Sequence, residues 1–177
     1  MTGRLLIAGV GNIFLGDDGF GVEVATRLAA LELPDWVHVS DYGIRGLHLA
    51  HDLANSYDSA ILIDAAARGG TPGTVYVIEP DRPVPPSADA GADAALAGTP
   101  VLDAHGMQPD VVLAMLSTLG AADRQVLVVG CEPASVDYGI GLSEPVAAAV
   151  DAAVAVVLDL VAGAGQADDH RLAVNAQ

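Results

Sequence analysis

The sequence is short of cysteine, of basic residues and of aromatic residues. Cys131 is the only cysteine among 177 residues, so no internal disulfide can form. Lys and Arg number 7 against 23 Asp and Glu, which gives a formal net charge of −16 at pH 7. An acidic excess of this size repels phosphate groups, so we expect that neither nucleic acid nor an anionic membrane surface is the main partner. Cations and basic partners are favoured instead.

The N-terminal residues lack the features of a secretion signal. The chain passes from Met1 and Arg4 directly into a short apolar run and a glycine-rich turn, without the h-region and cleavage site that a signal peptide needs. We therefore expect a cytoplasmic protein.

One long apolar stretch, residues 146–162, is interrupted by acidic residues. Asp151 and Asp159 lie within it, and at about 100° per residue they share one side of a helix with Glu144. The opposite side carries five apolar residues, which are Val150, Val154, Val157, Leu158 and Val161. This spacing predicts an amphipathic helix that packs on a core rather than a membrane span.

Short apolar runs alternate with segments of helical spacing along the chain. The runs predict strands at residues 5–10, 37–39, 60–64, 74–78 and 125–129. The helical spacing predicts helices at residues 21–29, 47–54 and 111–119, and a last helix that is capped by Ser143. Asp17 and Asp18 stand where carboxylates cap the N-terminus of the first helix.

The spacing of the third and fourth strands decides one point of topology. Only residues 68–73 separate them, whereas a parallel crossover needs about a dozen residues, so the fourth strand should run antiparallel to the third after a turn. The whole pattern predicts a three-layer α/β/α sandwich with a five-stranded, mostly parallel twisted sheet containing one antiparallel strand. We expect a single α/β domain at residues 1–165 with a long surface excursion at 80–100, and a flexible tail at 166–177 that follows fraying from Gly163 onward.

Three candidate ligands come from different loops at the edge where ligands of α/β sheets bind, beyond the carboxyl ends of the parallel strands. They are Asp18, Asp64 and His105. Two carboxylates and an imidazole suit a divalent ion such as nickel, zinc, iron or manganese and leave coordination positions open. Each residue also has a structural explanation, with Asp18 as a helix cap, Asp64 as an acceptor of turn amides and His105 as an exposed loop residue.

A nucleotide-binding motif is matched only weakly. Gly9 and Gly11 follow the first strand and Asp41 ends the second, as in a dinucleotide fingerprint, but Phe14 takes the place of the third glycine. Two further acidic residues in the same loop would set negative charge against a pyrophosphate. The glycines are equally explained by tight turns and by close packing of a helix on a strand.

The remaining histidines and the cysteine carry weaker hypotheses. His48 and His51 are three residues apart on the predicted second helix, so they form either part of a metal site or, more often, a solvated helix face. Cys131 ends a buried strand, where a small hydrophobic residue is a simpler explanation than a nucleophile. His38 alternates with valines and should face outward.

Residues 5–22, with the segments LLIAGVGN and IFLGDDGFGV, closely resemble the opening of the nickel-iron hydrogenase maturation endopeptidases. Later segments agree with that family in order along the chain. They are a DxGxxG turn at residues 41–46, a strand-ending aspartate at Asp64, a PGT hairpin at 72–74, a histidine segment at 104–106, and a strand and turn at 129–133. The resemblance extends from Leu5 to about Leu160.

The resemblance implies an endopeptidase that removes a short C-terminal peptide from the precursor of a hydrogenase large subunit after nickel has been inserted. In that family two carboxylates and a histidine are proposed to contact the nickel, and by motif these become Asp18, Asp64 and His105, the candidate catalytic and metal-binding residues. The nickel is expected to be presented by the substrate precursor, and the enzyme is expected to be a monomer. The family is grouped with aspartic-type peptidases, and the resemblance leaves open which group activates water.

Alternatives remain open at this point. The chain is alternatively a non-catalytic metal-sensing chaperone of the same precursor, or another metal-assisted hydrolase on this scaffold, since a fold alone does not fix a function. Asp41 and Arg45 either shape the crevice or form an ordinary turn salt pair.

Overall fold

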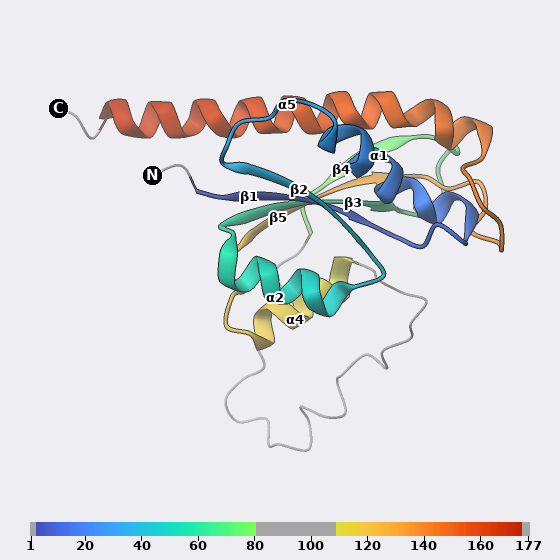
Figure 1. The fold of residues 1–177 in the computed structure, drawn as a ribbon, viewed down its shortest axis with the longest axis horizontal. Helices are drawn as coiled ribbons and strands as arrows, with labels where there is room; N and C mark the ends of the chain where they lie inside the picture. The colour runs from blue at the N-terminus through green and yellow to red at the C-terminus, as the bar shows by residue number, and fades with distance from the viewer. Residues whose placement is uncertain (1–2, 81–108, 175–177) are drawn as a thin grey trace, which may run out of the picture.

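A five-stranded sheet with the order β2-β1-β3-β5-β4 lies between two layers of helices in the computed structural model, which describes residues 3–80 and 109–174 (Figure 1). The strands are β1 (Leu5–Val10), β2 (Val37–Gly43), β3 (Ser59–Ala65), β4 (Val75–Ile78) and β5 (Gln125–Cys131). Four of them run parallel, and β4 pairs antiparallel with β5. The predicted mostly parallel sheet with one antiparallel strand is therefore confirmed.

The fourth strand has the predicted direction but a neighbour that the sequence pattern does not indicate. Because β4 is antiparallel to β5 and β5 is parallel to β3, β4 also runs against β3. However, β5 lies between them, so β3 and β4 are not neighbours and the segment after β3 crosses the end of β5. The reason is burial: β5 is mostly buried and suits the interior of the sheet, whereas β4 is short, with Val77 52% exposed, and suits an edge.

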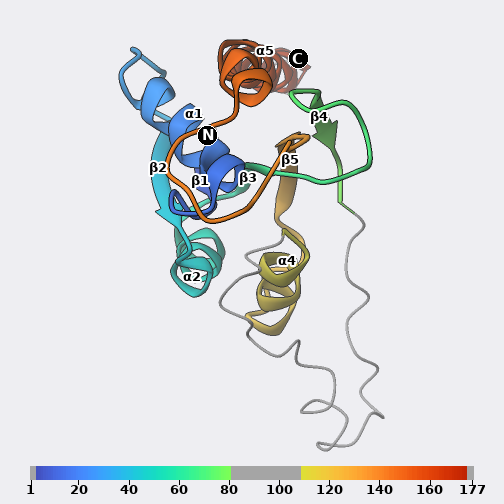
Figure 2. The ribbon, with the colours of Figure 1, turned by 90° about the vertical axis from the view of Figure 1, so that its right-hand side faces the viewer.

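The helices cover the two faces of the sheet in pairs (Figure 2). They are α1 (Phe20–Ala29), α2 (Gly46–Ser56), α4 (Pro109–Thr118) and α5 (Glu144–Val174), with the 3-10 helix η1 (Gly16–Gly19) ahead of α1. Residues of α1 and α5 pack against Leu5 and Ile7 on one face, and residues of α2 and α4 pack against Leu6 and Ala8 on the other. This alternation explains why β1 is a continuous apolar run, since both of its faces are buried.

Helix α5 is long and apolar enough to span a membrane by length and composition, with a mean hydropathy of 2.1 over Glu144–Gly165. Its buried residues pack in the same core as α1, as predicted for an amphipathic core helix. They are Val146, Ala149, Val150, Ala153, Val157 and Val161. The predicted fraying from Gly163 is wrong, because the helix continues to Val174. A helical glycine costs only about 1 kcal/mol relative to alanine, and no proline follows to end the helix.

The N-terminus of α1 approaches the sheet so closely that only glycine fits. A Cβ atom at Gly21 would lie 2.1 Å from the carbonyl oxygen of Ile63 and 2.3 Å from that of Val10. Gly11 has a φ of +124°, and a Cβ atom there would lie 1.8 Å from the carbonyl oxygen of Asp18. These contacts confirm the packing explanation of the glycine-rich turn, and they press the segment that carries Asp18 against the ends of β1 and β3.

Candidate active site

Asp64 is a buried carboxyl group near the carboxyl end of a central strand. It is only 6% exposed, and in the sheet it pairs with Gly130 of β5. Burial raises the pKa of Asp64 to about 8, and the nearby negative charge of Asp18 adds to this shift, although the backbone N–H of Ala65 opposes it. At neutral pH the carboxyl group of the free protein is therefore mostly protonated. In this form it can donate a proton, and it must lose that proton before it can bind a cation.

Asp18 approaches Asp64 from the loop that follows β1. Its Oδ2 accepts a hydrogen bond of 2.7 Å from the backbone N–H of Asn12, and the side chain is partly exposed. The helix η1 that contains Asp18 contacts β3. Gly21, in the first turn of the following helix α1, packs directly on Ile63, the residue before Asp64. The structure thus brings together two of the three residues that the sequence singles out.

The third residue, His105, lies outside the described residues, so its position relative to Asp18 and Asp64 is not part of this geometry. Among the residues whose side chains the structure describes, 3–80 and 111–165, no three His, Cys, Asp or Glu side chains form a group that could hold a metal ion. The two carboxyl groups alone amount to a partial ligand set, open toward whatever approaches the edge of the sheet.

The expectation that Asp17 and Asp18 cap the first helix is wrong. Helix α1 follows the 3-10 turn η1 and has Gly19 at its N-cap position, with no side-chain cap. The turn directs Asp18 back to Asn12 and directs Asp17 away from the helix, toward residues 134–143.

Asp17 is instead a buried clamp on the loop between β5 and α5. It is 1% exposed, and its carboxylate accepts backbone hydrogen bonds from Ala134 at 2.8 Å, Ser135 at 3.1 Å and Ser143 at 2.6 Å. The hydroxyl of Ser143 donates a fourth bond of 2.9 Å. Burial by itself raises the pKa of Asp17, but these bonds together outweigh it and hold the pKa below its usual value. Sequence reasoning missed this role, because the bonded partners lie far away in the chain.

Glu132 makes a second clamp, which fastens the segment between β3 and β4. It accepts hydrogen bonds from the backbone N–H groups of Arg68 at 2.8 Å and Gly69 at 3.0 Å, and from the hydroxyl of Tyr76 at 3.1 Å. The bond from Arg68 is the largest cause that lowers the pKa of Glu132, and burial opposes it. The sequence placed Glu132 at the correct edge without indicating this function.

The weaker candidates have structural roles. The guanidinium of Arg45 donates to the backbone carbonyl groups of Asp41 and Tyr42, so it braces the turn after β2 through the main chain. Burial raises the pKa of Cys131 to about 11, so this thiol stays protonated and is a poor nucleophile, as predicted for a small buried residue.

The exposed histidines agree with the solvated interpretations. His48 and His51 both lie on an exposed face of α2, and His38 is exposed on β2. Within the described residues none of them belongs to a metal-binding group.

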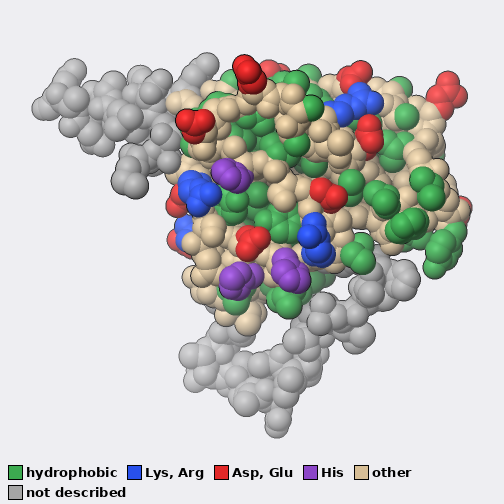
Figure 3. All heavy atoms as spheres, viewed as in Figure 1, with side chains coloured by type: hydrophobic (Ala, Val, Ile, Leu, Met, Phe, Trp, Pro, Cys, Tyr) green, Lys and Arg blue, Asp and Glu red, His purple; other side chains and the backbone are tan. Residues whose placement is uncertain are grey.

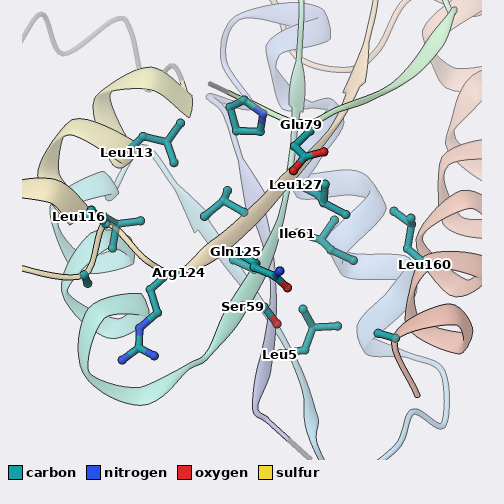
Figure 4. A pocket seen from close by; sticks show the side chains of 16 residues that line it. Leu5, Ser59, Ile61, Glu79, Leu113, Leu116, Arg124, Gln125, Leu127 and Leu160 are labelled. Atoms are coloured by element: carbon teal, nitrogen blue, oxygen red, sulfur yellow. The ribbon is translucent and has the colours of Figure 1, made fainter. Parts of the chain in front are cut away.

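A cavity of about 320 Å³ lies at the amino ends of the parallel strands, whereas Asp18 and Asp64 lie at their carboxyl ends (Figure 4). Its lining includes Leu5, Ser59 and Gln125, which begin their strands, together with Leu116 of α4 and Leu160 of α5. The walls are mainly apolar and hold no pair of carboxyl groups that face each other. The candidate site is therefore at the carboxyl ends of the strands, where the charge of Asp18 acts on the buried carboxyl group of Asp64.

Comparison with known sequences agrees with the motifs. A family model described as hydrogenase maturation protease matches residues 22–160. A hydrogenase 2 maturation protease from Escherichia coli is 33% identical over 157 residues, which cover 88% of this chain and 88% of that protein. A hydrogenase expression/formation protein, HupM, from Azotobacter chroococcum is 34% identical over 170 residues, which cover 93% of this chain and 76% of that protein.

Comparison with solved structures agrees with the fold. The hydrogenase maturating endopeptidase HybD from Escherichia coli matches with a TM-score of 0.71 and 30% identity, over 92% of this chain and 94% of that chain. A hydrogenase 2 maturation peptidase from a Thaumarchaeota archaeon matches with a TM-score of 0.65 and 33% identity, over 90% and 98% of the two chains. The likeness therefore extends over most of the chain in both sequence and fold.

Proposed function

This chain belongs to the hydrogenase maturation protease family, and from that premise we propose that it recognises the precursor of a hydrogenase large subunit by the nickel that the precursor already carries. As a maturation protease it is an endopeptidase that processes this precursor. In the proposed scheme it removes the C-terminal peptide, and it acts as a monomer in the cytoplasm.

The observation that carries the nickel proposal is the pairing of Asp64 with Asp18 at the carboxyl edge. A carboxyl group that is 6% exposed, with its pKa raised to about 8, is costly to keep unless a cation or a proton compensates it. The nickel of the precursor supplies such a cation when the substrate docks. Carboxylate oxygens and an imidazole nitrogen suit nickel, so Asp18 and Asp64 together with His105 are the ligands that we assign to it.

The same carboxyl groups provide the acid–base chemistry of peptide hydrolysis. A water oxygen must attack the scissile carbonyl carbon while a base takes its proton, and the nitrogen of the leaving peptide must gain a proton as the C–N bond breaks. A bound divalent ion polarises a carbonyl group or lowers the pKa of bound water. We assign the acceptance and the return of that proton to Asp18 and Asp64 jointly.

Mass analysis of a purified precursor separates the protease from a metal-sensing chaperone. The wild-type protein should shorten a nickel-loaded precursor by one defined C-terminal peptide and leave a nickel-free precursor intact. Asp64→Asn should bind the nickel-loaded precursor weakly and leave it uncut, while Asp35→Asn, which changes an exposed carboxylate ahead of β2, should cut normally. Equal cleavage with and without nickel would contradict the nickel proposal.

His105 has its own test, because its role rests on the family motif. His105→Ala should leave the unfolding temperature almost unchanged and greatly reduce cleavage of the nickel-loaded precursor. Normal cleavage by His105→Ala would remove this residue from the ligand set while keeping the roles of Asp18 and Asp64.

A further inference from the structure

Exposed apolar side chains gather at the carboxyl edge of the sheet. Among the described residues ten large hydrophobic side chains are exposed, and seven of them belong to the loops that follow β1, β2 and β5 or to the first residues after these loops. The seven are Ile13, Phe14, Ile44, Leu47, Val136, Tyr138 and Ile140. We call this set the apolar rim. Hydrophobic side chains are visible together at this end of the molecule in the space-filling view, on the right-hand side (Figure 3).

The exposure within the apolar rim is far above what packing requires. Tyr138 is 89% exposed and Ile140 is 83% exposed, so these side chains give almost nothing to the core. Single exposed hydrophobic residues are ordinary, whereas a group of them on neighbouring loops indicates an interaction site.

The loops that carry the rim are held in place rather than loosely attached. The backbone N–H of Gly139 donates to the carbonyl of Phe14 at 3.0 Å, and the N–H of Gly16 donates to the carbonyl of Gly139 at 2.9 Å. The Asp17 clamp holds the same loop through backbone hydrogen bonds from residues 134, 135 and 143. A hollow of about 330 Å³ lies beside this junction, lined by Ile13 and Ile140 among others. The rim is therefore a preformed surface, which lowers the entropic cost of binding a partner.

The charges around the rim are mostly negative. Asp41 in β2, Asp137 in the loop after β5 and Glu144 at the start of α5 are exposed, and so is the basic Arg45 after β2. Arg27, which lines the hollow with Ile13 and Ile140, is also exposed, but its guanidinium is paired with Glu23 and Asp151. A partner that complements this edge presents an apolar segment flanked by basic side chains, since like charges placed opposite each other oppose association.

We propose that the apolar rim is the docking surface for the hydrogenase precursor, which presents to it an apolar segment flanked by basic residues. This inference rests on the proposed function, and it places the specificity of the enzyme in side chains that lie outside the nickel ligand set. The rim is continuous with the catalytic edge, because Ile13 and Phe14 belong to the same loop as Asp18, and Ile140 belongs to the loop that Asp17 holds. A substrate seated on the rim has its scissile bond delivered to Asp18 and Asp64.

The test is a double variant, Tyr138→Ser with Ile140→Ser, assayed with the full nickel-loaded precursor. We expect kcat/KM to fall at least tenfold through KM, with kcat within twofold of the wild type, and the Kd for the precursor to rise at least tenfold. The matched control is Leu31→Ser with Leu119→Ser, which removes two exposed leucines that lie ahead of β2 and β5 at the opposite edge. This control should bind and cleave within twofold of the wild type, and both double variants should keep the wild-type unfolding temperature.

The outcomes separate the docking surface from the nickel scheme. Precursor binding by the rim variant within twofold of the wild type overturns the docking surface, even where cleavage depends on nickel and on Asp64. If the wild type cuts nickel-free precursor equally well, the nickel proposal fails, while the contrast in Kd between rim and control variants still decides the docking surface. Self-association of the wild type that the rim variant loses, with unchanged precursor binding, assigns the rim to a second copy of the chain and also overturns the proposal.

Discussion

Asp17 holds Ser143 through two hydrogen bonds, one from the backbone N–H at 2.6 Å and one from the hydroxyl at 2.9 Å. The two residues are 126 positions apart in the sequence, so this contact ties the loop after β1 to the start of α5. Because Asp18 directly follows Asp17, the same contact fixes the backbone of a residue that we assign to the nickel of the substrate. The clamp thus stabilises the loop and also holds the position of Asp18.

Replacing the clamp should loosen the loop that it holds. In Asp17→Asn an NH₂ group replaces one acceptor oxygen and faces backbone donors, so we expect the free energy of unfolding to fall by about 2–4 kcal/mol. Ser143→Ala removes only the hydroxyl bond and should cost about 1 kcal/mol. Urea denaturation measures both changes, and hydrogen exchange at residues 134–143 should rise more in Asp17→Asn. Equal losses in the two variants would show that the backbone hydrogen bonds to Asp17 contribute nothing beyond the hydroxyl bond.

Removing the ionisable group of Asp64 should abolish activity without unfolding the protein. Asp64→Asn keeps the size of the side chain and its position in β3 but cannot become an anionic ligand or a base. We expect cleavage of nickel-loaded precursor to fall below about 1% of the wild-type rate, in line with loss of an essential acid–base group, while the circular dichroism spectrum is unchanged. Cleavage at the wild-type rate by folded Asp64→Asn would eliminate the role of this residue.

The stability of Asp64→Asn should depend on pH in a defined direction. In the folded protein Asp64 ionises near pH 8, whereas the usual value, which applies to the unfolded chain, is 3.8. Between these pH values only the unfolded chain releases the proton, so the wild type loses stability as the pH rises. Asn has no such proton, so the free energy of unfolding of the variant should rise relative to that of the wild type, by on the order of a few kcal/mol between pH 4 and pH 8. Urea denaturation at both pH values checks this, and a difference that is constant with pH would contradict the raised pKa.

Gly21 should tolerate no side chain. A Cβ atom there would overlap the carbonyl oxygens of Ile63 and Val10, both of which belong to the sheet backbone and cannot rotate away. Gly21→Ala should therefore lower the free energy of unfolding by about 1–3 kcal/mol or more and reduce cleavage, because α1 must move away from Asp64.

Gly163→Ala is the matched control for this substitution. A Cβ atom at Gly163 meets nothing within 4 Å on α5, so the alanine should stabilise the helix by about 0.5–1 kcal/mol. Thermal or urea denaturation should give opposite signs for the two alanine variants. An unchanged free energy of unfolding in Gly21→Ala would show that the contact between α1 and β3 is looser than described.

The sequence by itself determined the local elements and the direction of the strands. The apolar run at β1 and the helical spacing of α5 are periodic, and periodicity reports burial without any knowledge of distant partners. The short connection before β4 likewise fixed its direction, because too few residues were available for a parallel crossover. The motifs around Asp18 and Asp64 also indicated the family.

Only the tertiary structure decided how distant segments meet. It placed β5 between β3 and β4, turned Asp17 from an expected helix cap into a clamp on Ser143, and buried Asp64 so that its pKa rises to about 8. It also gathered exposed apolar residues such as Phe14 and Tyr138 at one edge. Each of these features depends on contacts between residues far apart in the chain, and the energies of such contacts are set by packing and dielectric environment, which no local pattern of residues contains.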